Sequence, residues 1–185
     1  MPLSPEERSQ LAGLARAAVE AAIRGGPLPA AKDASGILSQ ARGCFVTLTN
    51  AGRLRGCIGT FQPSAPLAEL LPQIAAAATQ DGRFVWNPVT PAELPHLDIE
   101  VSILSPLEPM KSLEDLRIGT HGIYVVRGGR SGCFLPEVAT DQGWDATRFL
   151  DECCAGKAGL PAGAWRQPDA KVFLFTSEKF GQEGA

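Results

Sequence analysis

The amino-acid sequence predicts an α+β fold, in which helices pack against a mixed or antiparallel sheet. Two strand–turn–strand patterns, at residues 44–61 and 122–134, require antiparallel pairing of neighbouring strands. Helical periodicity occurs before, between and after these hairpins, which favours α+β over a doubly wound α/β sheet. With 185 residues, of which 44% are hydrophobic, the chain is long enough for one compact domain with a sizeable core.

Capping signals and apolar spacing indicate the first two helices. Ser4 and Glu7 form a capping box around a proline, and apolar residues then recur at helical spacing until Gly25. A second helix is expected to begin after Pro66 and to run to about Gln80. Its alanine-rich second half is suited to close packing against another element.

Alternating apolar and β-branched residues indicate the strands, and turns rich in glycine separate them. The predicted strands cover residues 44–49, 53–61, 97–103, 122–127, 130–134 and 172–175. The run Asn50-Ala51-Gly52 closes the first hairpin, and Gly128-Gly129 closes the second. Asp145 caps a last helix, which carries Cys153 and Cys154 on its apolar face.

Charge and composition narrow the possible functions and locations. The 17 basic and 20 acidic residues give a net charge of −3, whereas dedicated nucleic-acid binders usually carry a strong positive excess. The sequence contains no apolar run of transmembrane length and no secretory signal. Its five cysteines include no CxxC pair, which favours a reducing cytoplasm and predicts neither a cofactor nor a closed set of metal ligands.

The stretch from Arg53 to Phe61 is the most unusual in the chain. It places Gly56 and Gly59 inside a predicted strand, where glycine usually marks a bulge or the close approach of another backbone or of a ligand. Cys57 lies between them as a candidate nucleophile or acid/base group. An equally weighted interpretation treats the glycines as backbone packing positions and Cys57 as a small residue of the core.

Strand alternation suggests how a thiol site would be built. In a regular strand, Arg53 and Arg55 share a face with Cys57, whereas Leu54 and Ile58 lie on the other. Two guanidinium groups beside a thiol favour the thiolate, and they also suit an anionic ligand. The predicted ligand-binding positions are Arg53, Arg55, Gly56, Gly59, Arg83 and Arg130.

The same stretch resembles the signature of the AMMECR domain family, whose prokaryotic members are called AmmeMemoRadiSam system protein A. Further family motifs occur in order over nearly the whole chain. They are Asp81 to Phe84, Ile99 to Leu104, His121 to Ile123, Gly128 to Arg130, Phe134 to Pro136, Trp144, Lys157 to Pro161 and Trp165. Gly82, Cys133 and Glu137 depart from the family's usual proline, threonine and glutamine.

The resemblance implies a single AMMECR domain over residues 1–185, with a larger sheet lobe, a smaller lobe and a cleft near the signature. It also implies association with a Memo-like protein, similar to metal-dependent extradiol dioxygenases, and with a radical SAM protein. It implies no established activity. The radical chemistry would belong to that partner, because this chain lacks the CxxxCxxC spacing that ligates a cluster.

Two further residues suggest chemistry at a distance from the hairpin. His121 and Glu100 could join Cys57 in a metal site or in a thiol–imidazole–carboxylate relay. The favoured alternative is that His121 caps a turn and Glu100 pairs with an arginine. Three functions therefore remain open: a hairpin that binds an anionic ligand or a partner protein, a thiol-dependent enzyme using Cys57, and a nucleic-acid-associated factor.

Overall fold

The computed structural model describes residues 2–31 and 34–182, and it confirms the α+β class. The chain forms two compact units, each built on a four-stranded sheet. Unit 1 comprises Met1–Leu104 and Glu178–Ala185, and unit 2 comprises Ser105–Ser177. Within the described residues, no helix has both the length and the apolar character needed to cross a membrane.

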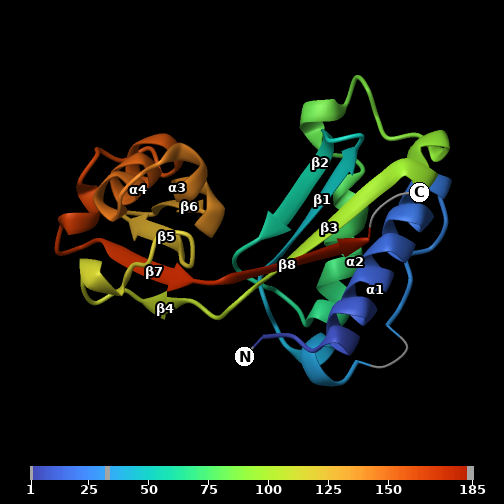
Figure 1. The fold of residues 1–185 in the computed structure, drawn as a ribbon, viewed down its shortest axis with the longest axis horizontal. Coiled ribbons are helices and arrows are strands. Elements are labelled where there is room, and N and C mark those ends of the chain that lie inside the picture. Colours follow the sequence, from blue (N-terminus) through green and yellow to red (C-terminus); the bar gives the residue numbers. More distant parts are fainter. Residues whose placement is uncertain (1, 32–33, 183–185) are drawn as a thin grey trace. The chain divides into compact units, whose positions relative to one another are not determined.

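Unit 1 is a sheet with the strand order β2-β1-β3-β8, covered on one face by two helices (Figure 1). Its elements are α1 (Pro5–Arg24), β1 (Cys44–Asn50), β2 (Arg53–Thr60), α2 (Leu67–Ala78), β3 (Leu97–Leu104) and β8 (Ser177–Gln182). Two short 3-10 helices, η2 (Gly82–Phe84) and η3 (Pro91–His96), connect α2 to β3. The predicted capping box of Ser4 and Glu7 is present at the start of α1.

The core of unit 1 lies between the sheet and the helices. Val46 and Leu48 of β1 and Val101 of β3 are fully buried in one cluster with side chains of α1 and α2. The alternate residues of these strands therefore lie on the opposite face, which we call the open face. Thr47 of β1 belongs to this face, and β2 forms one edge of the sheet.

Unit 2 has the strand order β4-β7-β5-β6 and its own core. Its elements are β4 (Glu108–Pro109), β5 (Gly122–Arg127), β6 (Arg130–Phe134), α3 (Pro136–Gln142), α4 (Ala146–Glu152), the π-helix η5 (Cys153–Lys157) and β7 (Lys171–Phe175). Phe149, Leu150 and Ile123 are fully buried in that core, together with Cys153 and Cys154.

The structure confirms the predicted hairpins and adds elements that the sequence did not predict, among them β8 and α3. The bounds of β5 and β6 are those expected, and β2 ends one residue before the predicted Phe61. β8 was not predicted, because its sequence Ser177 to Gln182 contains a single large apolar residue and no clear alternation. α3 was also missed; it begins at a proline and has only seven residues.

Candidate functional site

The β1–β2 hairpin contains a bulge that changes the predicted arrangement of the site. Thr49 pairs with Leu54 but Leu48 pairs with Gly56, so Arg55 is an extra residue on β2. The expectation that Arg53 and Arg55 share a face with Cys57 assumed a regular strand and is wrong. One inserted residue reverses the alternation, so that Leu54 is now opposite Thr49 of the open face and is exposed.

The side chain of Arg55 is buried and binds a carboxylate. Arg55 is 8% exposed, and its Nε and Nη2 donate to the two carboxylate oxygens of Glu93 at 2.8 and 3.0 Å. Nη2 also donates to the carbonyl of Pro88 at 3.2 Å. Arg55 therefore ties the hairpin to the segment that connects α2 to β3, and its bidentate fork is occupied.

Glu93 is held by a complete set of donors. Besides Arg55, it accepts hydrogen bonds from the Thr90 backbone amide at 3.1 Å and from Asn50 Nδ2 at 3.2 Å. The hydrogen bonds from Arg55 are the main reason that the pKa of Glu93 falls to about 2, with burial acting in the opposite direction. The pair is therefore ionised at neutral pH and stabilises this end of β2.

Gly56 is needed because a helix end lies against the strand. A Cβ at this position would overlap the carbonyl oxygen of Ala78, the last residue of α2. Gly56 is thus a position where another backbone approaches closely, one of the two interpretations expected from the sequence. This close approach brings the residues that come after α2 alongside the outer edge of β2.

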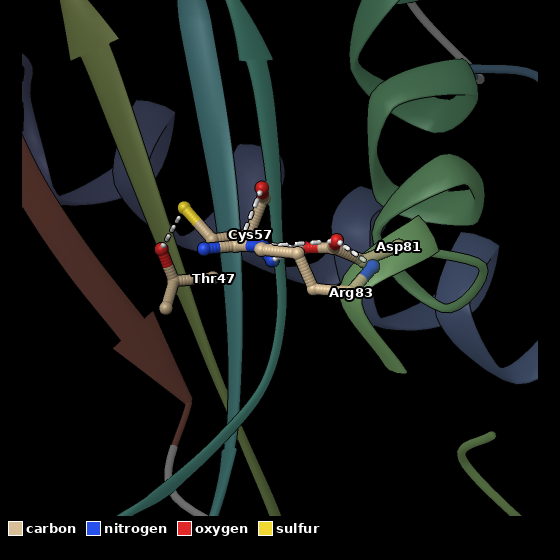
Figure 2. A network of polar contacts seen from close by, with 4 residues as sticks. All are labelled: Thr47, Cys57, Asp81 and Arg83. Carbon is tan, nitrogen blue, oxygen red and sulfur yellow. Dashed lines mark hydrogen bonds and ion pairs between the residues drawn. The ribbon is translucent and has the colours of Figure 1, made fainter. Parts of the chain in front are cut away.

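Asp81 and Arg83 of that segment clip the free edge of β2 at Cys57 (Figure 2). The Cys57 amide donates to Asp81 Oδ2 at 3.0 Å, and Arg83 Nη2 donates to the Cys57 carbonyl at 3.3 Å. Arg83 Nη2 also lies 2.6 Å from Asp81 Oδ2. The ion pair thus satisfies both backbone groups that a neighbouring strand would otherwise bind.

Asp81 is the buried member of this clip. It is 5% exposed, and the hydrogen bonds from Arg83 hold the pKa of its carboxyl well below the usual range. The backbone amides of Cys57 and Arg83 act in the same direction, whereas burial opposes them. Asp81 raises the pKa of Arg83 in return. Both groups are therefore charged at neutral pH.

The thiol of Cys57 lies on the open face, away from the clip. Its Sγ is 3.2 Å from Thr47 Oγ1, the donor on the neighbouring strand, and the residue is half-buried (Figure 2). Thr47 in turn pairs with Glu100 of β3, so the three residues form one row across the sheet. Two strand spacings, roughly 10 Å, separate the backbones of Cys57 and Glu100.

Gly59 also lies on the open face, beneath an aromatic ring. A Cβ at Gly59 would overlap the ring of Phe45, which packs edge-on against Phe61 with centroids 4.9 Å apart. Gly59 therefore serves side-chain packing at this end of the hairpin.

The carboxylate of Glu100 on β3 has a basic partner. It pairs with Lys179 of β8 at 3.5 Å, a lysine and not the arginine expected.

The other candidate residues, His121 and Arg130, belong to unit 2. His121 Nδ1 accepts the backbone amide of Arg117 at 3.2 Å, which is a turn cap of the kind expected from the sequence. Arg130, in β6, donates through Nη1 to the Gly159 carbonyl and is exposed. Across residues 2–31 and 34–182, no three His, Cys, Asp or Glu side chains gather in a way that could hold a metal ion.

Sequence reasoning missed several residues that shape this region. Asp81 was noted as part of a family motif, but neither it nor Glu93 was identified as an arginine partner. Trp86 was not considered, although it is the most exposed large apolar side chain in the described part of the chain. A tryptophan beside asparagine and proline, outside any periodic pattern, was the signal that could have identified it.

Comparisons with known proteins match the chain to one protein family. The chain matches the AMMECR1 family over residues 12–180. It is 43% identical to a protein of Methanothermobacter thermautotrophicus, covering 99% of this chain and 98% of that one. It is 41% identical to a protein of Methanopyrus kandleri, covering 98% of this chain and 91% of the relative.

A solved structure extends the similarity to the fold. The crystal structure of an uncharacterised protein from Pyrococcus horikoshii has a TM-score of 0.83 and 37% sequence identity. The similarity covers 96% of this chain and 93% of that one. The ordered motifs, the fold and the family match agree over nearly the full length of the sequence. The chain belongs to the AMMECR1 family.

Proposed function

We propose that this chain is a binding subunit of a small modification system. It docks a Memo-like protein or a radical SAM protein through the Arg53–Phe61 hairpin. The single observation that carries the proposal is the occupation of Arg55, the buried arginine of the hairpin. Glu93 accepts hydrogen bonds from both Nε and Nη2 of Arg55, so this guanidinium does not offer its bidentate fork to a small anion.

The exposed side chains of the hairpin support protein docking. Leu54 and Arg53 are both exposed at the turn end of β2, and the clip and the Arg55–Glu93 pair hold the strand beneath them. Apolar side chains and arginine on a fixed backbone are typical of protein interfaces. A net charge of −3 supports a protein partner more than a nucleic acid.

Binding to purified Memo-like and radical SAM proteins from the same organism tests this proposal. Isothermal titration calorimetry should detect a complex with at least one of them. We expect the double variant Arg53→Glu/Leu54→Asp to weaken that complex about tenfold or more, since both changes place a carboxylate in the interface. The pair Arg117→Glu/Leu113→Asp in unit 2 changes two exposed residues and is the matched control. If neither protein binds the wild-type chain, the proposal fails.

One observation favours a second candidate, a thiol-dependent enzyme. Cys57 is half-buried on the open face, and a hydroxyl lies within hydrogen-bond distance of its sulfur. Neither Glu100 nor His121 is bonded to the thiol, so this candidate lacks the general base that such mechanisms use. A time course of alkylation by iodoacetamide, compared between wild type and Cys57→Ser by peptide-resolved mass spectrometry, tests it: a Cys57 that stays unmodified in the native protein rules this candidate out.

A further inference from the structure

The segment between η2 and η3 exposes two large apolar side chains. Trp86 is 96% exposed and Val85 is 64% exposed, more than any other large apolar side chain in the described residues. Tryptophan is highly buried on average in folded proteins, and it is enriched among the residues that dominate protein interfaces. An indole that is almost entirely exposed to water is therefore a candidate contact for a binding partner.

Bonds to β2 fix this segment on both sides. On the N-terminal side of Trp86, Asp81 and Arg83 bond to the backbone of Cys57. After it, Pro88 accepts a hydrogen bond from Arg55. A turn between these anchors is closed by the Asn87 amide, which donates to the Phe84 carbonyl at 2.9 Å. The indole is therefore presented by a backbone that is fixed before binding, which reduces the entropy lost on association.

We infer that residues 83–86, the docking segment, insert Trp86 into an apolar pocket on the partner protein. This inference rests on the proposed function and names the element that supplies most of its affinity. Val85 adds apolar area beside the indole. The partner is a protein whose pocket carries a carboxylate at its rim. Arg83 of the docking segment donates hydrogen bonds to that carboxylate.

The guanidinium of Arg83 has donors left for such a carboxylate. Its side chain is 59% exposed, and Nε and Nη2 are directed toward Asp81 and the Cys57 carbonyl. Nη1 makes no hydrogen bond to any residue in the described part of the chain. Its two N–H groups can therefore donate to a partner that covers the neighbouring apolar pair, and a carboxylate is their strongest acceptor.

Charge disfavours the other occupants of this surface. A second copy of the chain in a twofold interface would place the same guanidinium in both halves of the contact, where like charges repel. A membrane surface is normally anionic, and the chain carries a net charge of −3. A single indole with one valine also provides little apolar area for stable lipid binding.

The test compares substitutions by titration calorimetry with the Memo-like and radical SAM proteins. Trp86→Ala should raise the Kd about 30-fold or more, as expected for a central interface tryptophan. Leu28→Ala, which removes another exposed apolar side chain of unit 1, is the matched control and should change the Kd less than about twofold. Raising NaCl from low to high concentration should weaken the wild-type complex several-fold.

The outcomes separate this inference from the proposed function. If Trp86→Ala binds like the wild type while Arg53→Glu/Leu54→Asp does not, the hairpin docks the partner and the docking segment does not. If binding is insensitive to salt, the acidic rim is overturned. A wild-type dimer that Trp86→Ala converts to monomer, or Trp86-dependent binding to anionic vesicles, would assign the segment to a second copy or to lipid. Absence of binding to either protein overturns the function itself.

Discussion

The two units cover the edge of a hairpin in similar ways but with different chemistry. In unit 1, Gly56 of the edge strand β2 lies against the end of α2. In unit 2, Gly132 of the edge strand β6 lies against the end of η5, where an added Cβ would be 2.5 Å from the Ala158 nitrogen. Each edge is therefore closed by a helix end that only glycine admits.

The surroundings of the two edge strands differ in the exposure of their polar, aromatic and thiol side chains. After α2 the chain forms polar anchors and an exposed indole, and Cys57 remains half-buried on the open face. The helix beside β6 instead places Cys153 and Cys154 in the core, where burial raises the pKa of both thiols. Similar edge protection thus leaves an exposed indole beside the edge strand of unit 1, whereas in unit 2 the adjoining helix buries its two thiols.

The largest effect is expected from filling the two glycine positions. Gly56→Ala and Gly132→Ala should each lower the free energy of unfolding by roughly 3 kcal/mol, because neighbouring backbone must move. Chemical denaturation measures this loss. Gly13→Ala in α1, where nothing lies within 4 Å of an added Cβ, is the control and should not destabilise. Wild-type stability of Gly56→Ala would refute the close approach of α2.

Acid should weaken the anchors of unit 1. The pKa of Glu93 is lowered from 4.5 to about 2, so its contribution is present above the unfolded value and is lost as pH falls through the folded one. We expect about 3 kcal/mol to disappear between these values. Glu93→Gln should be less stable at pH 7 and should flatten this part of the profile. The exposed Glu69→Gln should leave it unchanged; an unaltered slope in Glu93→Gln would contradict the assignment.

Thiol reactivity distinguishes the two regions without altering the fold. Iodoacetamide should modify Cys57 at least about tenfold faster than Cys153 or Cys154, which are fully buried and require local opening. Peptide-resolved mass spectrometry over time gives the three rates. Urea should abolish the difference. Equal rates in the native protein would show that the open face does not expose this sulfur.

The smallest effect on stability is expected at the docking segment. Trp86→Phe should change the free energy of unfolding by less than about 0.5 kcal/mol, because the indole contacts water. It should nevertheless remove the fluorescence that iodide quenches most readily, since Trp144 and Trp165 are half-buried. Strong quenching that persists in Trp86→Phe would mean that another tryptophan is the exposed one.

Local patterns were sufficient for much of the fold. The alternation in β1, β3 and β5, the glycine turns and the Ser4 capping box each depend on neighbouring residues, and each prediction is confirmed. Short elements with weak patterns, such as α3 and β8, were missed for the same reason. The unusual glycines of β2 also pointed correctly to close contacts.

The sequence by itself determined the fold class and the hairpins, and it singled out the stretch from Arg53 to Phe61 as unusual. Only the tertiary structure decided which groups meet there. Arg55 binds Glu93, 38 residues away, and Cys57 is bonded by Asp81, 24 residues away. Such pairs depend on the position of the end of α2 in the folded chain. A one-residue bulge in β2 also reverses the faces on which alternation places the side chains. Neither is a property of neighbouring residues, so periodicity cannot reveal it.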